Sequence, residues 1–453
     1  MYCKLFEDKL LCNLIIIRIS TCISVTKRLK FYLIVYKSIK KSLNMSNQQK
    51  TKLVHLMGTI FLAALFSIPS YAALPTIAVD PVITKKDQPT DSLVYKQLDD
   101  LSLNQSKTRR DKGVIRSFND HLISKSEMDA FIKQQMDSLD IPGLSIAFIN
   151  DDKIVYHNAL GVKNNETLEK VDNATIFDAA SISKTVFSFF VMKMVDDGLL
   201  DLDTPLYTYM EYPDIAYDER YKLITARMVL SHTSGFPNWR FLDQNGNYNP
   251  NGKLTIQFDP GTKFQYSGEG YEYLANVVAH LKGVDKNGLQ RLINTSIFKP
   301  LAIKHTSFVW NDYIENHRAD GHLKGKPNKG YSSNAKDPNF KASASLQTEA
   351  KEFSNFLLAL MNAKILSEKS HQELLKIQSS SVATKKSKAR KYGLGIAIEK
   401  SDYGTNYFHG GDNLSSTALY MFNKEKKVGY VFFTNSEKRN SFNKNLRDFL
   451  LTK

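Results

Sequence analysis

The apolar positions near both ends of the chain form short runs that are typical of β-strands. Residues 144–149 and 153–159 are two such runs, and Asn150-Asp151-Asp152 between them predicts the turn of a hairpin. Further strands are predicted near the C-terminus, at 392–399, 417–422 and 428–433. Strand-rich segments at both ends predict one antiparallel sheet that is built from both ends of the chain.

The remaining apolar positions recur mostly at helical spacing. Ser126 is a suitable N-cap for a first helix, and Pro142-Gly143 ends that segment. Its predicted buried face holds Met128, Phe131, Ile132, Met136 and Leu139. Further helices are predicted at 271–281, 348–361 and 442–451. The predicted fold class is therefore α+β: a central antiparallel sheet flanked by helices, with a mostly helical region inserted at about residues 200–345.

Residues 45–72 have the pattern of a signal peptide. Lys50 and Lys52 precede an apolar run at 56–66, which is too short to span a bilayer comfortably. The small residues Ser70 and Ala72 predict cleavage after Ala72. We therefore expect a periplasmic or secreted protein with no stable membrane span after cleavage. The alternative is a protein that an uncleaved signal anchors in the membrane.

A signal peptide normally stands at the N-terminus, whereas here residues 1–44 precede it. We interpret residues 1–44 as an over-extended gene start, with translation beginning at Met45; a first membrane segment around residues 10–17 is the rival interpretation. Residues 73–120 contain three prolines and little periodicity, so we expect a leader or linker there. Residues 121–453 then form the functional domain.

Charge and cysteine content change once the N-terminal segments are set aside. The 453-residue chain carries a formal net charge of +15, but eleven basic and only two acidic residues lie within residues 1–72. The basic run at 385–391 has no interleaved aromatic residues, so we do not expect nucleic-acid binding. All three cysteines also lie within residues 1–72, which excludes a thiol nucleophile from the mature chain.

The sequence lacks the motifs of zinc proteases and P-loops, and it lacks the G-x-S-x-G motif of α/β-hydrolases. His317 and His322 are five residues apart, a spacing that suits neither a helix face nor a strand face. We therefore expect no metal and no other cofactor.

The pattern S-x-x-K at Ser181 and Lys184 begins a strongly apolar stretch that Gly198 ends, which predicts a buried helix. Unpaired N–H groups and the helix dipole at its start favour developing negative charge. Burial would lower the pKa of Lys184, so that a neutral amine could take the proton of Ser181. The alternative interpretation is a plain N-cap serine with a lysine that extends to the surface.

Two further segments carry candidate chemistry. Tyr266 lies on a Gly-rich loop ahead of a predicted helix, where a phenol near a lysine can relay a proton; a core tyrosine is the alternative. His409-Gly410-Gly411 lies at a predicted strand edge, where paired glycines let a ligand approach the backbone. The following N–H, of Asp412, can complete an oxyanion hole with that of Ser181. A hairpin turn with an incidental histidine is the alternative there.

Together, Ser181-x-x-Lys184, Tyr266-Ser267-Gly268 and His409-Gly410-Gly411 resemble, in this order and at these spacings, the motifs of the serine β-lactamase and penicillin-binding-protein superfamily. The segment 230–235 (LSHTSG) is similar to a segment of its class C β-lactamase-like branch, where it is expected to be architectural. That branch includes esterases and D-aminopeptidases. The resemblance covers about residues 126–450 and implies a β-lactamase/transpeptidase-like fold.

The resemblance also implies hydrolysis through an acyl-enzyme, with a role for each motif residue. Ser181 would attack a carbonyl, and Lys184 coupled to Tyr266 would take and return its proton. The N–H groups of Ser181 and Asp412 would stabilise the oxyanion. His409, in the place of the family's lysine, would orient the substrate or tune Tyr266.

Two departures from the family pattern bear on the substrate. Gly268 stands where β-lactamases usually have Asn, which removes an amide contact, and His409 is only fractionally cationic near neutral pH, which weakens a carboxylate anchor. We therefore expect an esterase, or an amidase or peptidase of D-amino-acid substrates, rather than an efficient β-lactamase. The expected substrate is a small molecule or a peptide derived from the cell wall. A non-catalytic penicillin-binding or scaffold protein that retains the fold is the alternative.

Overall fold

The computed structural model describes residues 114–241, 247, 249, 251–328, 337–383 and 389–452, all within the unit Pro89–Lys453. The predicted over-extended start, the predicted signal peptide and residues 73–113 of the predicted leader lie outside these residues. No helix of the described part is both long and apolar enough to cross a membrane.

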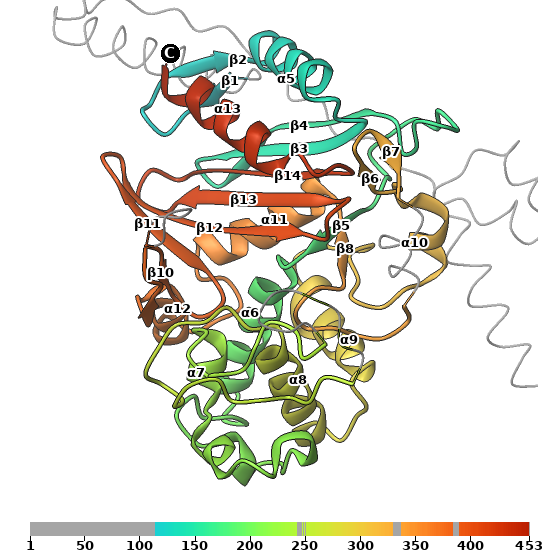
Figure 1. The fold of residues 1–453 in the computed structure, drawn as a ribbon. Helices are drawn as coiled ribbons and strands as arrows, with labels where there is room; N and C mark the ends of the chain where they lie inside the picture. The colour runs from blue at the N-terminus through green and yellow to red at the C-terminus, as the bar shows by residue number, and fades with distance from the viewer. Residues whose placement is uncertain are drawn as a thin grey trace, which may run out of the picture. The chain divides into compact units, whose positions relative to one another are not determined.

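The main sheet of the described residues is antiparallel. Its strands, in chain order, are β3 (Gly143–Asn150), β4 (Lys153–Gly161), β9 (Ser379–Ser380), β10 (Lys391–Tyr392), β11 (Ala397–Ser401), β12 (Gly404–Asp412), β13 (Thr417–Asn423) and β14 (Val428–Thr434). In space they lie in the order β4-β3-β14-β13-β12-β11-β10-β9 (Figure 1). Strand β14 pairs with β3, with Val431 opposite Ala147. The prediction of one sheet built from both ends of the chain is therefore confirmed.

The strands of this sheet direct alternate side chains into two hydrophobic cores. In β3, Ile146 belongs to the core that includes helices α5 (Lys125–Leu139) and α13 (Arg439–Thr452). The next residue, Ala147, belongs to the larger core on the opposite face, where α11 (Ala350–Met361) packs against β3 and β14. Both faces of the sheet are therefore covered by helices, as expected for this fold class (Figure 1).

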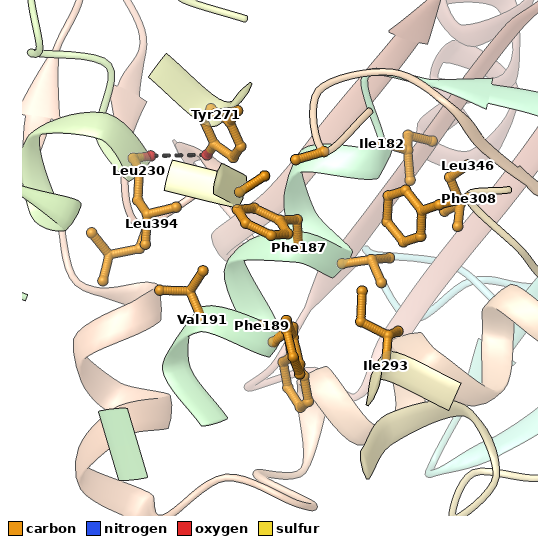
Figure 2. Packing of buried hydrophobic residues seen from close by; sticks show 14 of the residues in the cluster. Ile182, Phe187, Phe189, Val191, Leu230, Tyr271, Ile293, Phe308, Leu346 and Leu394 are labelled. Atoms are coloured by element: carbon orange, nitrogen blue, oxygen red, sulfur yellow. Dashed lines mark hydrogen bonds between the residues drawn. The ribbon is translucent and has the colours of Figure 1, made fainter. Parts of the chain in front are cut away.

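Helix α6 (Ser183–Asp196) is apolar on nearly every side and is buried in the larger core. Its Phe189 packs against Phe356 of α11, with ring centroids 5.3 Å apart. On another side, Phe187 lies 6.2 Å from the ring of Tyr271. Figure 2 shows Phe187 and Phe189 among the apolar side chains that surround the helix. Contacts on several sides hold the N-terminus of α6 in place.

Where it is described, the segment between β5 (Phe177–Ala180) and β8 (Leu346–Thr348), which pair with each other, consists of helices joined by long loops and one short hairpin. After α6, its helices are η1 (Leu206–Thr208), η2 (Pro213–Ile215), η3 (Glu219–Leu223), α7 (Ala226–Leu230), α8 (Glu269–Leu281), α9 (Gly288–Ile293), η4 (Asn294–Phe298) and α10 (Asp312–His317). The hairpin β6 (His322–Leu323) and β7 (Lys326–Pro327) follows α10. Beyond β8, α12 (Glu368–Leu375) lies between α11 and β9.

The start of the described chain differs from the sequence prediction in two respects. Residues 114–116 belong to the predicted leader, but they form strand β1 (Val114–Arg116) and pair with β2 (Leu122–Ser124). The cap of α5 is Ser124 rather than Ser126. The Ser124 side chain accepts from the N–H of Glu127, whose carboxylate accepts from the N–H of Ser124. This capping box occupies both donors and so starts the helix one residue before Ser126.

Two other boundaries differ because of local backbone geometry. The strand predicted at 392–399 is divided into β10 and β11, since the chain turns at Gly395, whose φ of +76° suits glycine. The helix predicted from residue 348 begins at Ala350, because residues 346–348 form β8 instead.

Candidate active site

Ser181 lies in the turn between β5 and α6, where its side chain is partly exposed. The preceding residue, Ala180, has a left-handed φ of +46°, which turns the chain sharply out of the strand. The N-cap of α6 is Ile182, and no side chain caps the helix. The alternative interpretation of Ser181 as a helix cap is therefore wrong, because its hydroxyl makes no capping hydrogen bond to the first turn of α6.

Lys184 is completely buried one turn along α6. Its Nζ donates to the carbonyl oxygen of Ser343 at 2.8 Å and lies 3.4 Å from Oγ of Ser181. Burial lowers the pKa of Lys184 to about 7, although the negative charge of Glu272 opposes the effect. A substantial fraction of the amine is therefore neutral near pH 7. The alternative of a lysine that extends to the surface is also wrong.

Tyr266 lies on the loop that precedes α8, with its ring over Lys184. Nζ of Lys184 is 4.7 Å from the ring centroid, close enough for a cation–π contact when the amine is charged. Burial, more than any other factor, raises the pKa of Tyr266 well above its usual range, and a hydrogen bond with Ser181 acts in the opposite direction. The phenol is therefore protonated near neutral pH and linked to the Ser181 hydroxyl.

His409 lies within β12 and is buried. Its Nδ1 lies 2.9 Å from the carbonyl oxygen of Gly410, while its Nε2 has no hydrogen-bond partner among the described residues. Burial first, and then the charge of Lys184, lower the pKa of His409 to about 3. The imidazole is therefore neutral at physiological pH and does not replace the positive charge of a lysine.

The glycines after His409 let β12 run close to the turn that carries Ser181. A Cβ on Gly411 would lie 2.1 Å from the carbonyl oxygen of Ala179, so only glycine fits there. A Cβ on Gly410 would meet the guanidinium of Arg439 at 3.2 Å. Asp412, at the end of β12, is exposed, and its carboxylate lies 3.6 Å from the same guanidinium. The segment 410–412 thus borders the Ser181 turn through its backbone.

Gly268 is buried beside Tyr266, and its N–H donates to the carbonyl oxygen of Asn238 at 3.1 Å. A Cβ at this position would lie 2.7 Å from that oxygen. The asparagine that β-lactamases usually have at this position would therefore not fit here, because the neighbouring backbone occupies the space of a side chain.

The fold thus brings Ser181, Lys184, Tyr266 and His409 together from the start of α6 and the turn before it, the loop before α8, and β12. A family model described as Beta-lactamase matches residues 128–452. The chain belongs to the Beta-lactamase family. Protein flp of Staphylococcus aureus (strain MW2) is 24% identical over 332 residues, which cover 69% of this chain and 63% of Protein flp. The chain described here thus spans less than two thirds of the length of Protein flp.

Two solved structures share the fold of this Beta-lactamase family protein. The octameric penicillin-binding protein homologue from Pyrococcus abyssi superposes with a TM-score of 0.61 at 20% identity, covering 73% of this chain and 78% of its own. EstCE1, a hydrolase with promiscuous acyltransferase activity, superposes with a TM-score of 0.62 at 17% identity, covering 71% of this chain and 97% of its own. The predicted β-lactamase/transpeptidase-like fold is confirmed.

A cavity of about 370 Å³ is lined by residues that lie next to the catalytic segments in the chain, but not by Ser181, Lys184, Tyr266 or His409. Its wall includes Asn413, which directly follows Asp412, and Asp178, three residues before Ser181. Trp239, which also lines the cavity, would lie 3.2 Å from a Cβ on Gly268. Within the described residues, no group of three or more His, Cys, Asp or Glu is arranged to hold a metal ion.

Two residues of this Beta-lactamase family protein contact the site although neither is among its predicted residues. Arg439 of α13 donates from Nη1 to the carbonyl oxygen of Gly411 at 2.7 Å. The ring of His232 lies 4.3 Å from that of Tyr266. The LSHTSG segment could have pointed to His232, but no sequence signal distinguished Arg439, which is far from the other motifs in the chain.

Proposed function

We propose that this protein is an exported serine hydrolase that cleaves an ester or amide through an acyl-enzyme on Ser181. The observation that carries the proposal is the completely buried amine of Lys184, 3.4 Å from Oγ of Ser181, with its pKa lowered to about 7. A neutral amine in this position is a base for the serine hydroxyl.

In the acylation step, Oγ of Ser181 bonds to the substrate carbonyl carbon and its proton passes to Lys184. The carbonyl oxygen becomes an oxyanion, which the backbone N–H groups of Ser181 and Asp412 stabilise. The tetrahedral intermediate collapses, the bond to the leaving group breaks, and the proton returns to the leaving group through Tyr266. The protonated phenol at the start of the step supports this relay.

In the deacylation step, water attacks the acyl carbon and gives its proton to the Lys184–Tyr266 pair. The bond between the acyl carbon and Oγ of Ser181 breaks, the carboxylic acid leaves, and the proton returns to the serine. The resting enzyme is restored, so that no co-reactant other than water is needed.

The preferred substrate is an ester, or an amide of a D-amino acid, rather than a β-lactam. A neutral, buried His409 offers no positive charge to the carboxylate of a β-lactam, and the packing around Gly268 excludes the amide side chain of β-lactamases. The fold that the chain shares with EstCE1, a hydrolase, is consistent with the proposed hydrolase activity. Export rests on the signal-peptide pattern at 45–72.

The proposal is tested by comparing wild type with Ser181→Ala on a short-chain nitrophenyl ester, a chromogenic cephalosporin and a D-alanyl anilide. We expect ester cleavage well above background and slow cephalosporin cleavage, both lost in the variant. If no substrate is cleaved and a fluorescent penicillin still labels Ser181, the protein is a penicillin-binding protein instead. N-terminal sequencing of the native product tests export: a chain that begins at Ala73 supports it, and one that retains Tyr2 contradicts it.

A further inference from the structure

We propose that His232 is a positioning residue for the proposed reaction: it holds the phenol of Tyr266 in register with Ser181 and Lys184. The inference rests on the proposed function, in which Tyr266 relays a proton. It goes beyond the architectural role that we expected for the LSHTSG segment, because His232 accepts hydrogen bonds from both residues that flank Tyr266.

His232 binds the backbone on both sides of Tyr266. The N–H of Gln265 donates to the carbonyl oxygen of His232 at 2.8 Å. The N–H of Ser267 donates to the ring Nδ1 of the same histidine at 3.1 Å. A single residue thus holds the peptide group directly after Tyr266 and the one between Phe264 and Gln265, which restricts the backbone on both sides of Tyr266. The left-handed φ of His232, +62°, is the backbone conformation in which both contacts are made.

The imidazole also packs against the phenol itself. The two ring centroids are 4.3 Å apart, with the planes tilted by 34°. On its other sides the His232 ring lies 5.3 Å from that of Tyr392 and 5.5 Å from that of Tyr271. The imidazole is completely buried in this aromatic enclosure, so it limits the rotation of the Tyr266 side chain as well as the position of its backbone.

The hydrogen bond from Ser267 requires one protonation state of His232. Since Nδ1 accepts that bond, the ring proton is on Nε2 and the imidazole is neutral. Burial and the nearby charge of Lys184 lower the pKa of His232 well below its usual range, in agreement with this state. The Nε2 atom is buried without a partner among the described residues.

Placement matters because a proton relay works only over hydrogen-bond distances. Tyr266 must reach the Ser181 hydroxyl while its ring remains over Lys184, and a displacement of about 1 Å can lower a rate about 100-fold. Loss of the Nδ1 acceptor frees the peptide after Tyr266, whereas the bond from Gln265 to the backbone of His232 survives any side-chain substitution. The loop should therefore stay folded but hold the phenol loosely.

Two substitutions test separately the hydrogen-bond acceptor and the aromatic ring of His232. His232→Asn keeps an oxygen near the position of Nδ1 and tolerates a left-handed φ; His232→Phe keeps a ring and removes the acceptor. We expect kcat for ester hydrolysis to fall about 100-fold in H232F with KM within about threefold, and to stay within about fivefold of wild type in H232N. His232→Gln, whose carbonyl cannot overlay Nδ1, is a second variant without the acceptor if H232F does not fold.

The decisive comparison adds Tyr266→Phe. A residue that acts through the phenol has no further effect once the hydroxyl is gone, so H232F/Y266F should have the same kcat as Y266F. A merely structural role would lower kcat in both backgrounds by the same factor, which would overturn the inference. So would full activity in H232F or a 100-fold loss in H232N alone. If Y266F and Ser181→Ala both leave hydrolysis unchanged, the proposed function itself fails, and this inference fails with it.

Discussion

The pH dependence of ester hydrolysis is the sharpest test of the role proposed for Lys184. With a pKa of about 7, its amine is about half neutral at pH 7, about one tenth neutral at pH 6 and about one hundredth neutral at pH 5. If only the neutral amine accepts the proton of Ser181, kcat/KM rises about tenfold per pH unit below pH 7 and levels off above about pH 8. With a solvent-exposed lysine, this rising limb of the pH profile would lie at about pH 10.

Substitution of Glu272 should shift this limb, the rise of kcat/KM with pH, in a direction that can be predicted. Its negative charge raises the pKa of Lys184 against the effect of burial. Glu272→Gln removes the charge and therefore lowers the pKa of Lys184, which moves the limb to lower pH. The carbonyl oxygen of a glutamine can still accept from the N–H of Ser343, which donates to the Glu272 carboxylate at 3.1 Å. Glu269→Gln, at the start of the same helix, is the matched control, because Glu269 is not among the charges that act on Lys184.

The assay is kcat/KM for a nitrophenyl ester between pH 5 and 9 at constant ionic strength, with Ser181→Ala as the blank. We expect a limb near pH 7 in wild type and in E269Q, and a limb at lower pH in E272Q. A wild-type profile that is flat over this range, a limb above pH 9, or a shift of E272Q to higher pH would refute the reasoning.

Three further predictions concern stability, each measured by urea denaturation. Because the folded pKa of Lys184 lies below that of an unfolded lysine, near about 10, the free energy of unfolding should rise by about 2 kcal/mol between pH 7 and 9 in wild type but not in Lys184→Met. Gly411→Ala, whose Cβ would lie 2.1 Å from the carbonyl oxygen of Ala179, should cost about 1–3 kcal/mol and lower kcat; an equal effect of Gly410→Ala would contradict this. Phe189→Ala should cost about 3–5 kcal/mol, because the ring is completely buried.

Much of the sheet could be predicted from the sequence because its strands have local signals. The runs at 144–149 and 428–433 correspond to β3 and β14 to within one residue at each end. The break after β10 was missed, because the apolar character of the segment continues through Gly395 while its backbone turns. The cap of α5 was placed two residues late, since Ser124 and Ser126 are both suitable and only the contacts of Glu127 distinguish them.

The sequence by itself determined the order of the motifs around Ser181, Tyr266 and His409, and with it the family and the fold. Those signals are local: each motif needs only a few neighbouring residues to be identified. Only the tertiary structure decided the electrostatics of the site, since the pKa values of Lys184 and His409 depend on burial by segments that are far apart in the chain. The contact of His232 with both sides of Tyr266 has the same origin, because it exists only where two distant loops pack together.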